Sequence, residues 1–340
     1  MDALLPDYVQ WLMDKENYPH QVESVELIQT HISYIVLAGA YAYKFKKPVD
    51  FGFLDFTSLE KRKYFCNEEL RLNRRLCPNV YLRTVELGKC CDDFCWGEGD
   101  EPIEYAVQMR RLKEDRMMGL LIARGQLQKA DIIRIADVLI PFYERAGRSD
   151  RVKQFGDVRV VSRTIQENFM ETRQFVGGVA LPESRFKKIQ RIALRFLGKE
   201  QIFAQRVRLN KICECHGDLH SGNICLEQEV AIFDCIEFNE RLRCTDIAAD
   251  LAFMAMDLDY HSLHDYSDLF INSYLERSED EKLMDVLAFY MCYRAYVRGK
   301  IGLLTSADSH VSAETRKNAE ESAKKYFMLA EEYGEQIECR

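Results

Sequence analysis

The sequence predicts an α+β protein of two lobes, because strand patterns gather in its first third and helical patterns fill most of the rest. Short runs rich in Val, Ile, Tyr and Phe, broken at Gly39 and Pro48, are typical of an antiparallel meander. These runs cover residues 22–30, 33–38 and 40–45. We therefore expect an antiparallel sheet plus one helix in an N-terminal lobe, residues 1–111, and a mainly helical C-terminal lobe, residues 112–340.

The individual elements follow from the same periodicity. A helix is predicted over residues 58–76, because leucines recur among many charges until Cys77-Pro78 ends the pattern. Two further strands, 80–87 and 103–109, are joined by a stretch rich in Cys and Asp that we expect to be an exposed loop. The helical lobe is predicted over 117–147, 162–206 and the chain after Thr245, with turns near Gly299 and Ser306 and a strand-rich piece near 216–238.

An apolar stripe near the C-terminus has helical spacing, and we expect it to pack on its own lobe. It consists of Ala319, Ala323, Tyr326, Phe327, Ala330 and Tyr333.

Length and charge exclude several classes of function. The chain has 340 residues, of which 47% are hydrophobic and 30% are charged, enough for two ordinary cores. Asp and Glu number 55 against 47 Lys and Arg, a net charge of −8, so the basic field of a nucleic-acid-binding protein is missing. No apolar run approaches the roughly 20 residues that span a bilayer, and the first residues lack a signal-peptide pattern. We expect a cytoplasmic protein without nucleic-acid or membrane partners, and the sequence predicts no oligomeric state.

The 12 cysteines are interpreted mainly as reduced thiols, because disulfide frameworks belong to short secreted chains. Cys90, Cys91 and Cys95 lack the paired spacing of a structural zinc site. We expect them to form the reduced tip of a hairpin.

The segment Cys215-His216-Gly217-Asp218-Leu219-His220-Ser221-Gly222-Asn223 places two glycines and several polar side chains between apolar runs. This composition predicts a tight loop that holds functional groups. Residues 224–226 and 230–233 can pair as a hairpin, which would bring Asn223 and Asp234 to neighbouring positions. An amide oxygen beside a carboxylate suits Mg²⁺, which leaves other positions to water and phosphate oxygens. Asp218 would then receive a proton from an attacking hydroxyl, as phosphoryl transfer requires.

These residues resemble the catalytic segment of the aminoglycoside phosphotransferase and choline kinase-like superfamily, which shares the protein-kinase fold. The resemblance implies that Asp218 is the catalytic base, that Asn223 and Asp234 bind Mg²⁺, and that ATP is the phosphate donor. It implies a small-molecule acceptor with a hydroxyl group. His216 matches the family's structural histidine, which braces the loop, and the sequence assigns no role to His220.

The resemblance extends to the N-terminal lobe. Lys44 matches the family's nucleotide lysine, with Lys46 and Lys47 as competitors; alternation puts Lys46 on the same face as Lys44. Glu69 matches the glutamate that pairs with this lysine, and Glu68 is the alternative.

The turn between the first two strands contains no glycine, so it differs from the phosphate cover of protein kinases. Thr30 and Ser33 could bind phosphate there through hydroxyls or amides. Met109 ends the strand that matches the family's interlobe hinge, whose backbone would face the purine. Asp250 matches a structural aspartate beneath the catalytic loop.

Three longer motifs are similar to a bacterial subgroup called aminoglycoside phosphotransferase family enzymes. They are Tyr43–Phe51, Asp234–Asn239 and Tyr293–Lys300.

The acceptor itself is not predicted. Acidic side chains in the helical lobe would attract a cationic acceptor, whereas Arg294, Arg298 and Lys300 would attract an anion. The acidic residues are Asp257, Asp259, Asp265, Asp268 and Glu276.

Two other classes of function are considered. A catalytically silent nucleotide-binding or scaffold protein would explain the glycine-free turn. A metal hydrolase could use soft ligands at short spacing. These ligands would be Cys213, Cys215, His216 and His220.

Overall fold

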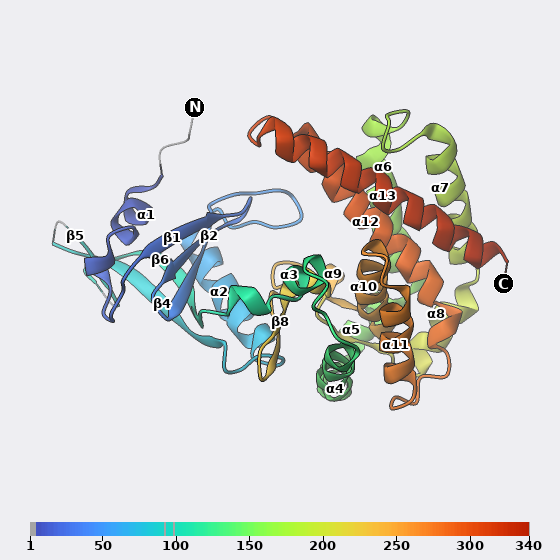
Figure 1. Ribbon diagram of the computed structural model, residues 1–340, viewed down its shortest axis with the longest axis horizontal. Helices are drawn as coiled ribbons and strands as arrows, with labels where there is room; N and C mark the ends of the chain where they lie inside the picture. The colour runs from blue at the N-terminus through green and yellow to red at the C-terminus, as the bar shows by residue number, and fades with distance from the viewer. Residues whose placement is uncertain (1–4, 92, 98, 340) are drawn as a thin grey trace. The chain divides into compact units, whose positions relative to one another are not determined.

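The computed structural model describes residues 5–91, 93–97 and 99–339, which form two compact units of mixed α and β structure (Figure 1). The first unit extends to Leu121 and includes Asn223–Glu240, and the second comprises Ile122–Gly222 and the chain from Arg241 onward. The predicted α+β class is confirmed. The first unit gains residues 112–121 and 223–240 relative to the expected boundary at residue 111. The functions assigned to the two lobes stay predictions.

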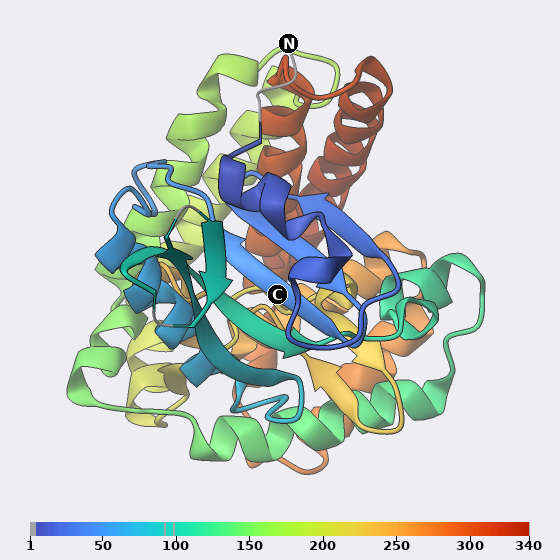
Figure 2. The ribbon, with the colours of Figure 1, turned by 90° about the vertical axis from the view of Figure 1, so that its left-hand side faces the viewer.

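The first unit is built on an antiparallel sheet with strand order β1-β2-β3-β6-β4-β5, seen in front in Figure 2. The hairpin from β2 to β3 turns at Gly39, whose φ of +59° and close approach to Gln21 leave no room for a side chain. Its strands are β1 (Val25–Gln29), β2 (Ser33–Ala38), β3 (Tyr41–Lys46), β4 (Tyr81–Cys90), β5 (Asp93–Trp96) and β6 (Glu101–Arg110).

Strand β5 occupies the stretch that was predicted to be an exposed loop. Phe94 and Trp96 pack against an aromatic cluster that includes Trp11 and Tyr43. This packing stabilises β5, although the polar composition of the stretch predicts a loop. Trp11 lies on a short helix that the sequence analysis missed, α1 (Asp7–Leu12).

The prediction of a reduced hairpin tip is wrong, because Cys90 and Cys95 form a disulfide. The pairing of β4 with β5 brings their Cα atoms to 5.9 Å, within the range that a disulfide needs. Cys91 is a free, exposed thiol.

Helix α2 (Leu59–Asn73) packs against β6 and β4 (Figure 1). The hydroxyl of Ser58 caps its first turn by accepting the amide of Lys61. Alternation along β3 sends Tyr43 and Phe45 to the core on one face of the sheet, and Lys44 and Lys46 to the other face.

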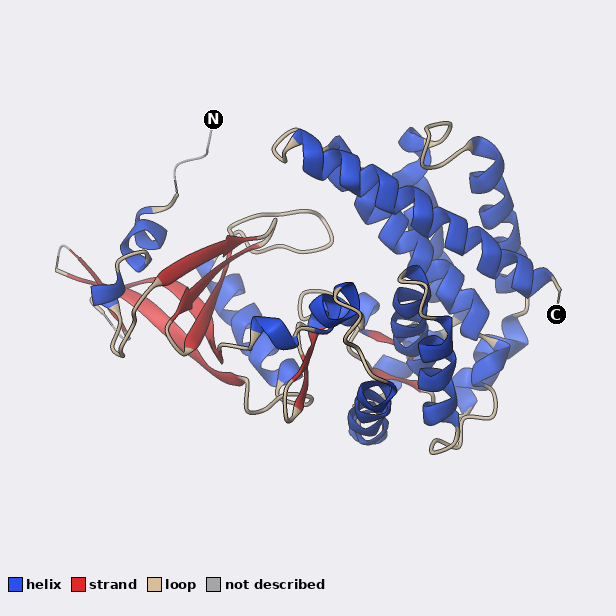
Figure 3. Cartoon of the chain, viewed as in Figure 1, coloured by secondary structure: helices blue, strands red, loops and turns tan. Residues whose placement is uncertain are grey.

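The second unit is mainly helical (Figure 3). A short antiparallel ladder pairs β7 (Ile212–Glu214) with β10 (Cys244–Asp246), and the sequence analysis missed it. The stretch 162–206, which was expected to be largely helical, contains three helices, the first of which begins at Val158. The helices are α3 (Met118–Ala123, which spans the unit boundary), α4 (Lys129–Arg145), α5 (Asp150–Lys153), α6 (Val158–Thr172), α7 (Glu183–Leu197), α8 (Glu200–Arg208), α9 (Glu240–Arg243), α10 (Ile247–Tyr260), α11 (His264–Leu275), α12 (Leu287–Ala307) and α13 (Ala313–Glu338).

The predicted turn near Gly299 is wrong, because α12 runs unbroken from Leu287 to Ala307. Glycine serves close packing here: a Cβ at Gly299 would lie 2.8 Å from the ring of Phe327 on α13. The apolar stripe of α13 packs on α12 and α7, so its predicted packing within its own lobe is confirmed. In the described part of the chain, no helix is long and apolar enough to cross a membrane.

Gly302 tests this close packing of α12 with α13. Gly302→Ala should lower the free energy of unfolding by about 1–2 kcal/mol, because its Cβ would lie 2.8 Å from the carbonyl oxygen of Ala319. Gly119 on α3 has no heavy atom within 4 Å of an added Cβ, so Gly119→Ala should leave stability unchanged or raise it by up to about 1 kcal/mol. Urea unfolding followed by circular dichroism measures both, and equal effects would contradict the account.

Candidate active site

The predicted hairpin after Asn223 is present in the first unit. Strands β8 (Ile224–Leu226) and β9 (Val230–Ile232) pair antiparallel, and the amide of Phe233 donates to the carbonyl oxygen of Asn223 at 3.0 Å. This pairing brings Asn223 next to the segment that carries Asp234, as expected from the sequence.

Lys44 is the centre of a buried charge cluster in the first unit. Its Nζ lies 2.8 Å from Oε1 of Glu69 and 2.5 Å from Oδ1 of Asp234. Burial lowers the pKa of Lys44, but the charges of Asp234 and Glu69 outweigh it and hold the pKa well above its usual value. Lys44 is therefore a fixed positive charge directed at the predicted metal aspartate.

Glu69, and not Glu68, is the partner of this lysine. Glu69 is fully buried on α2, whereas Glu68 pairs with Arg71 at the surface. Burial raises the pKa of Glu69, but the charges of Lys44 and Lys46 outweigh burial and lower it below the ordinary value of 4.5.

Asp234 is held in an unusual backbone conformation. Its φ is +65°, a region that residues other than glycine rarely adopt and that clusters at functional sites. Its amide donates to the hydroxyl of Tyr81 at 3.3 Å, and the next amide, of Cys235, donates to Oδ1 of Asn73 at 2.9 Å. Tyr81 and Asn73 are not predicted from the sequence, because they lie far from Asp234 in the chain.

Asn223 and Asp234 form a donor set that fits Mg²⁺. Both offer hard oxygen atoms, and the side chain of Asp234 is 43% exposed, so water and phosphate oxygens could complete the shell. Their assignment as metal ligands stays a prediction.

The other residues predicted to bind nucleotide are Thr30 in the turn between β1 and β2, Ser33 in β2 and Met109 in β6. The hydroxyl of Thr30 accepts the amides of Ile32 and Ser33 and closes the turn between β1 and β2. The hydroxyl of Ser33 is buried and has no hydrogen-bond partner among the described residues. Met109 lies in β6 between β3 and β4, paired with Ala42 and Tyr81. Their contacts with nucleotide stay predictions.

The predicted catalytic loop lies in the second unit and is held by Asp250 of α10. This fully buried carboxylate accepts the amides of His216 at 2.7 Å and Gly217 at 2.9 Å, and also the hydroxyl of Tyr143 at 3.3 Å. Nδ1 of the buried His216 ring accepts the amide of Asp218 at 3.2 Å. This geometry fits the bracing role expected for His216.

Asp218 carries a stable negative charge. Burial alone would raise its pKa, but the nearby charges of His220, Arg298 and His216 outweigh burial and lower the pKa below its usual range. Nε2 of His220 lies 3.3 Å from Oδ2 of Asp218. Asp218 is therefore ionised at neutral pH and able to accept a hydrogen bond from a hydroxyl.

The soft ligands considered for a metal hydrolase do not gather around one point. Within residues 5–91, 93–97 and 99–339, no three His, Cys, Asp or Glu side chains could together hold a metal ion. Sγ of Cys213 and Sγ of Cys215 lie 3.5 Å apart, but His220 is directed to Asp218 and to the amide of Gly222.

The acidic residues considered for a cationic acceptor serve different purposes. Asp257 is buried and accepts the amide of Ser221 at 2.9 Å, and Asp259 accepts the hydroxyl of Tyr333 at 2.6 Å. Asp265 and Asp268 are exposed on α11. Two of the five are therefore engaged in hydrogen bonds within the second unit.

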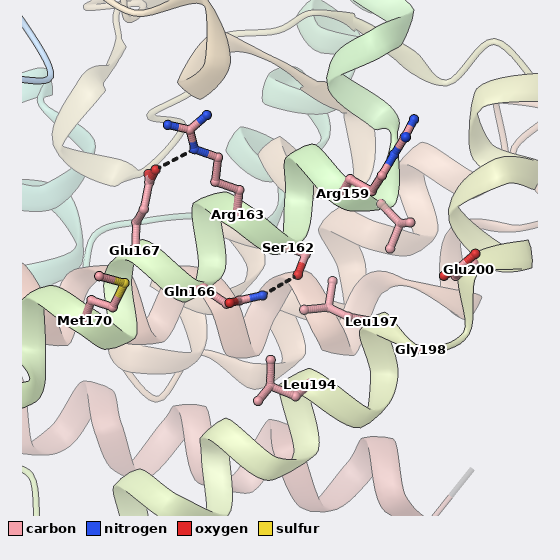
Figure 4. Close-up of a pocket in the computed structure, with 11 residues that line it drawn as sticks. Arg159, Ser162, Arg163, Gln166, Glu167, Met170, Leu194, Leu197, Gly198 and Glu200 are labelled. Atoms are coloured by element: carbon pink, nitrogen blue, oxygen red, sulfur yellow. Dashed lines mark hydrogen bonds and ion pairs between the residues drawn. The ribbon is translucent and has the colours of Figure 1, made fainter.

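A cavity of about 680 Å³ lies between α6, α7 and the start of α8 (Figure 4). Two pairs of side chains on α6 contact each other along its wall. Arg163 forms an ion pair with Glu167, and Nε2 of Gln166 donates a hydrogen bond to the hydroxyl of Ser162. None of the residues that line this cavity was predicted to belong to the active site. The lining residues are Val158, Arg159, Ser162, Arg163, Gln166, Glu167, Met170, Leu194, Leu197, Gly198 and Glu200.

Comparisons with known proteins agree with the observed fold. No family model matches the chain. Uncharacterized proteins from two strains of Mycobacterium tuberculosis and from Mycobacterium bovis are 34% identical to it over 279 residues. The match covers 82% of this chain and 54% of each relative, so the chain spans about half the length of the curated relatives it matches.

One solved structure shows the same fold over nearly the whole chain. It is a choline/ethanolamine kinase family protein from Mesorhizobium loti, matched over 97% of this chain and 99% of that chain, with a TM-score of 0.53 and 11% identity. The predicted kinase-like fold is confirmed.

The lowered pKa of Glu69 predicts a pH-dependent contribution to stability. The unfolded carboxylate takes up its proton near pH 4.5 and the folded one only at lower pH, so the contribution is complete above pH 4.5 and is lost as the pH falls through the folded value. Glu69→Gln should cost about 3–5 kcal/mol at pH 7, and this cost should shrink toward pH 3. Urea unfolding across this pH range measures it.

Glu68→Gln is the matched control, because Glu68 neighbours Glu69 on the same helix but forms a surface pair. It should cost less than about 1 kcal/mol. A pH-independent cost of Glu69→Gln would contradict the assignment.

Asp250 gives a second test, in the other unit. Asp250→Ala would leave the amides of His216 and Gly217 buried without their acceptor and should cost about 2–5 kcal/mol of unfolding free energy. Asp250→Asn keeps one acceptor oxygen but turns its NH2 group toward the other buried amide, so it should not restore the lost stability. A loss below about 1 kcal/mol for Asp250→Ala in urea unfolding would show that the two amides do not depend on this carboxylate.

Proposed function

We propose that this chain, whose fold is that of the aminoglycoside phosphotransferase and choline kinase-like superfamily, transfers the γ-phosphate of ATP to a hydroxyl of a small molecule. The observation that carries the proposal is the buried contact of Lys44 with both Glu69 and Asp234. A lysine fixed by a glutamate beside a partly exposed aspartate is the arrangement that phosphoryl transfer uses to hold a nucleotide.

In the first unit, Lys44 would supply positive charge to the phosphates, and Glu69 would fix the direction of its ammonium group. Asn223 and Asp234 would hold Mg²⁺, which when bound neutralises charge on the phosphate oxygens. In the turn between β1 and β2, Thr30 is the proposed phosphate contact, and Ser33, which is 1% exposed, is proposed to act only through its backbone.

In the second unit, Asp218 would accept a hydrogen bond from the acceptor hydroxyl. The hydroxyl oxygen forms a bond to the γ-phosphorus, the bond from that phosphorus to the leaving oxygen of ADP breaks, and Asp218 takes the proton. His216 and Asp250 hold the loop backbone, so the Asp218 carboxylate is placed before the acceptor binds. We also propose that the protein acts in the cytoplasm and that its substrate is not a nucleic acid.

A second candidate function is nucleotide binding without transfer. The turn between β1 and β2 favours it, because Thr30 closes the turn on itself and Lys47 donates to the carbonyl oxygen of Thr30 at 2.7 Å. The charge cluster around Lys44 would then hold a nucleotide for a scaffold.

Transfer of labelled phosphate separates the two functions. The full chain is incubated with γ-labelled ATP, Mg²⁺ and a deproteinised metabolite extract, and separately with protein. Asp218→Ala should lower label transfer to a small molecule by about 10²–10⁴-fold, because proton transfer from the hydroxyl loses its acceptor. Asp150→Asn, which alters a fully exposed aspartate of the same unit, should leave transfer unchanged.

Label appearing in a small molecule only when Asp218 is present supports the kinase. If wild type and Asp218→Ala both leave the extract unlabelled while wild type binds ATP, the scaffold function is the better account.

A further inference from the structure

A second buried lysine, Lys46, lies beside the Lys44 cluster. Its side chain is 1% exposed, and its Nζ lies 2.8 Å from Oε2 of Glu69 and also donates to Oε1 of Glu237, whose side chain is 4% exposed. Glu69 therefore gives one oxygen to each lysine: Oε1 to Lys44 and Oε2 to Lys46.

These contacts fasten the segment after β9 to β3 at two points. Asp234 and Glu237 are three residues apart, and they contact Lys44 and Lys46, which are two residues apart on one face of the strand. Asn73 adds a third link, since its Nδ2 donates to the carbonyl oxygen of Glu69 and its Oδ1 accepts the amide of Cys235.

Stability alone does not account for this arrangement. A buried ion pair roughly breaks even against apolar side chains of similar volume, because desolvation of both charges offsets their attraction. What a buried pair does provide is a single geometry, since a displaced charge would be left without its partner in a low-dielectric interior.

We propose that Lys46 and Glu237 are positioning residues that fix Asp234 and the second oxygen of Glu69, and thereby set how tightly the nucleotide with its metal is held. The proposal rests on the proposed function. Neither side chain is exposed enough to touch a ligand: Lys46 is 1% and Glu237 4% exposed, against 11% for Lys44, and of the two lysines it is Lys44 that contacts Asp234. Of the two lysines on this face of β3, Lys44 would thus contact the ligand and Lys46 would position the residues around it.

Glu237→Gln tests the proposal with Glu104→Gln as a matched control. Glu104 forms another buried ion pair of the first unit, with Arg62 at 2.8 Å, and is 3% exposed. Both substitutions remove a buried carboxylate charge and keep the side-chain shape. The assay uses the full chain, a fluorescent ATP analogue and increasing Mg²⁺, and records the Mg²⁺ concentration at half-maximal binding together with the melting temperature.

Glu237→Gln should raise the half-maximal Mg²⁺ concentration about tenfold. Glu104→Gln should leave it at the wild-type value, although both variants melt earlier. Amide hydrogen exchange should also become faster over residues 233–239 in Glu237→Gln and stay at the wild-type rate there in Glu104→Gln.

A double variant separates positioning from stability. Lys46→Met combined with Glu237→Met removes the charges of this pair and should recover the part of the melting temperature that Lys46→Met alone loses through the unpaired Glu237 carboxylate; Oε2 of Glu69 still lacks its lysine. It should keep the raised Mg²⁺ requirement, whereas a merely structural role predicts that the two recover together.

The outcomes distinguish this proposal from the one on which it rests. Wild-type binding of the analogue with an unchanged Mg²⁺ requirement in Glu237→Gln overturns the positioning role alone. Absence of Mg²⁺-dependent binding in wild type overturns the proposed function, and the positioning role with it.

Discussion

The first unit depends on one buried carboxylate shared by two lysines. Glu69 joins α2 to β3 through Lys44 and Lys46, and these lysines in turn hold the segment that follows β9. Because a buried charge is costly unless its partners are in place, this carboxylate restricts the helix, the strand and the segment to one mutual arrangement. The strained backbone of Asp234 persists within that arrangement.

In the second unit, a buried carboxylate likewise holds the proposed catalytic loop. Asp250 is fully buried, and its two oxygens accept consecutive backbone amides, of His216 and Gly217. The ring of His216 then accepts the amide of Asp218. Directional hydrogen bonds therefore connect α10 to the backbone of the proposed base and fix its position. In each unit a carboxylate that is closed to solvent positions an aspartate that is not.

The sequence predicts those parts of the site that rest on local pattern. Alternation places Lys44 and Lys46 on one face, and turn chemistry pairs β8 with β9. The family resemblance favours Glu69 but leaves Glu68 open, and burial on α2 decides between them. The contact of Lys46 with Glu237 joins residues 191 positions apart and follows no period, so only the folded chain reveals it.

The same limit explains the errors in the predicted fold. Strand β5 is stabilised by aromatic packing with residues near the N-terminus, and the disulfide of Cys90 with Cys95 follows from pairing that the polar stretch does not predict. Gly299 has the composition of a turn but the role of a close contact between α12 and α13, because the ring of Phe327 fills the space of a side chain.

The proposed active site requires one set of residues to hold both the nucleotide and its metal. A crystal structure of the full chain with a non-hydrolysable ATP analogue and Mn²⁺ in place of Mg²⁺ tests it most directly, since Mn²⁺ is located by its anomalous scattering. The account predicts Mn²⁺ bound by oxygen atoms of Asn223 and Asp234, with Nζ of Lys44 hydrogen-bonded to the phosphates. Mn²⁺ and the triphosphate bound to other residues would contradict it.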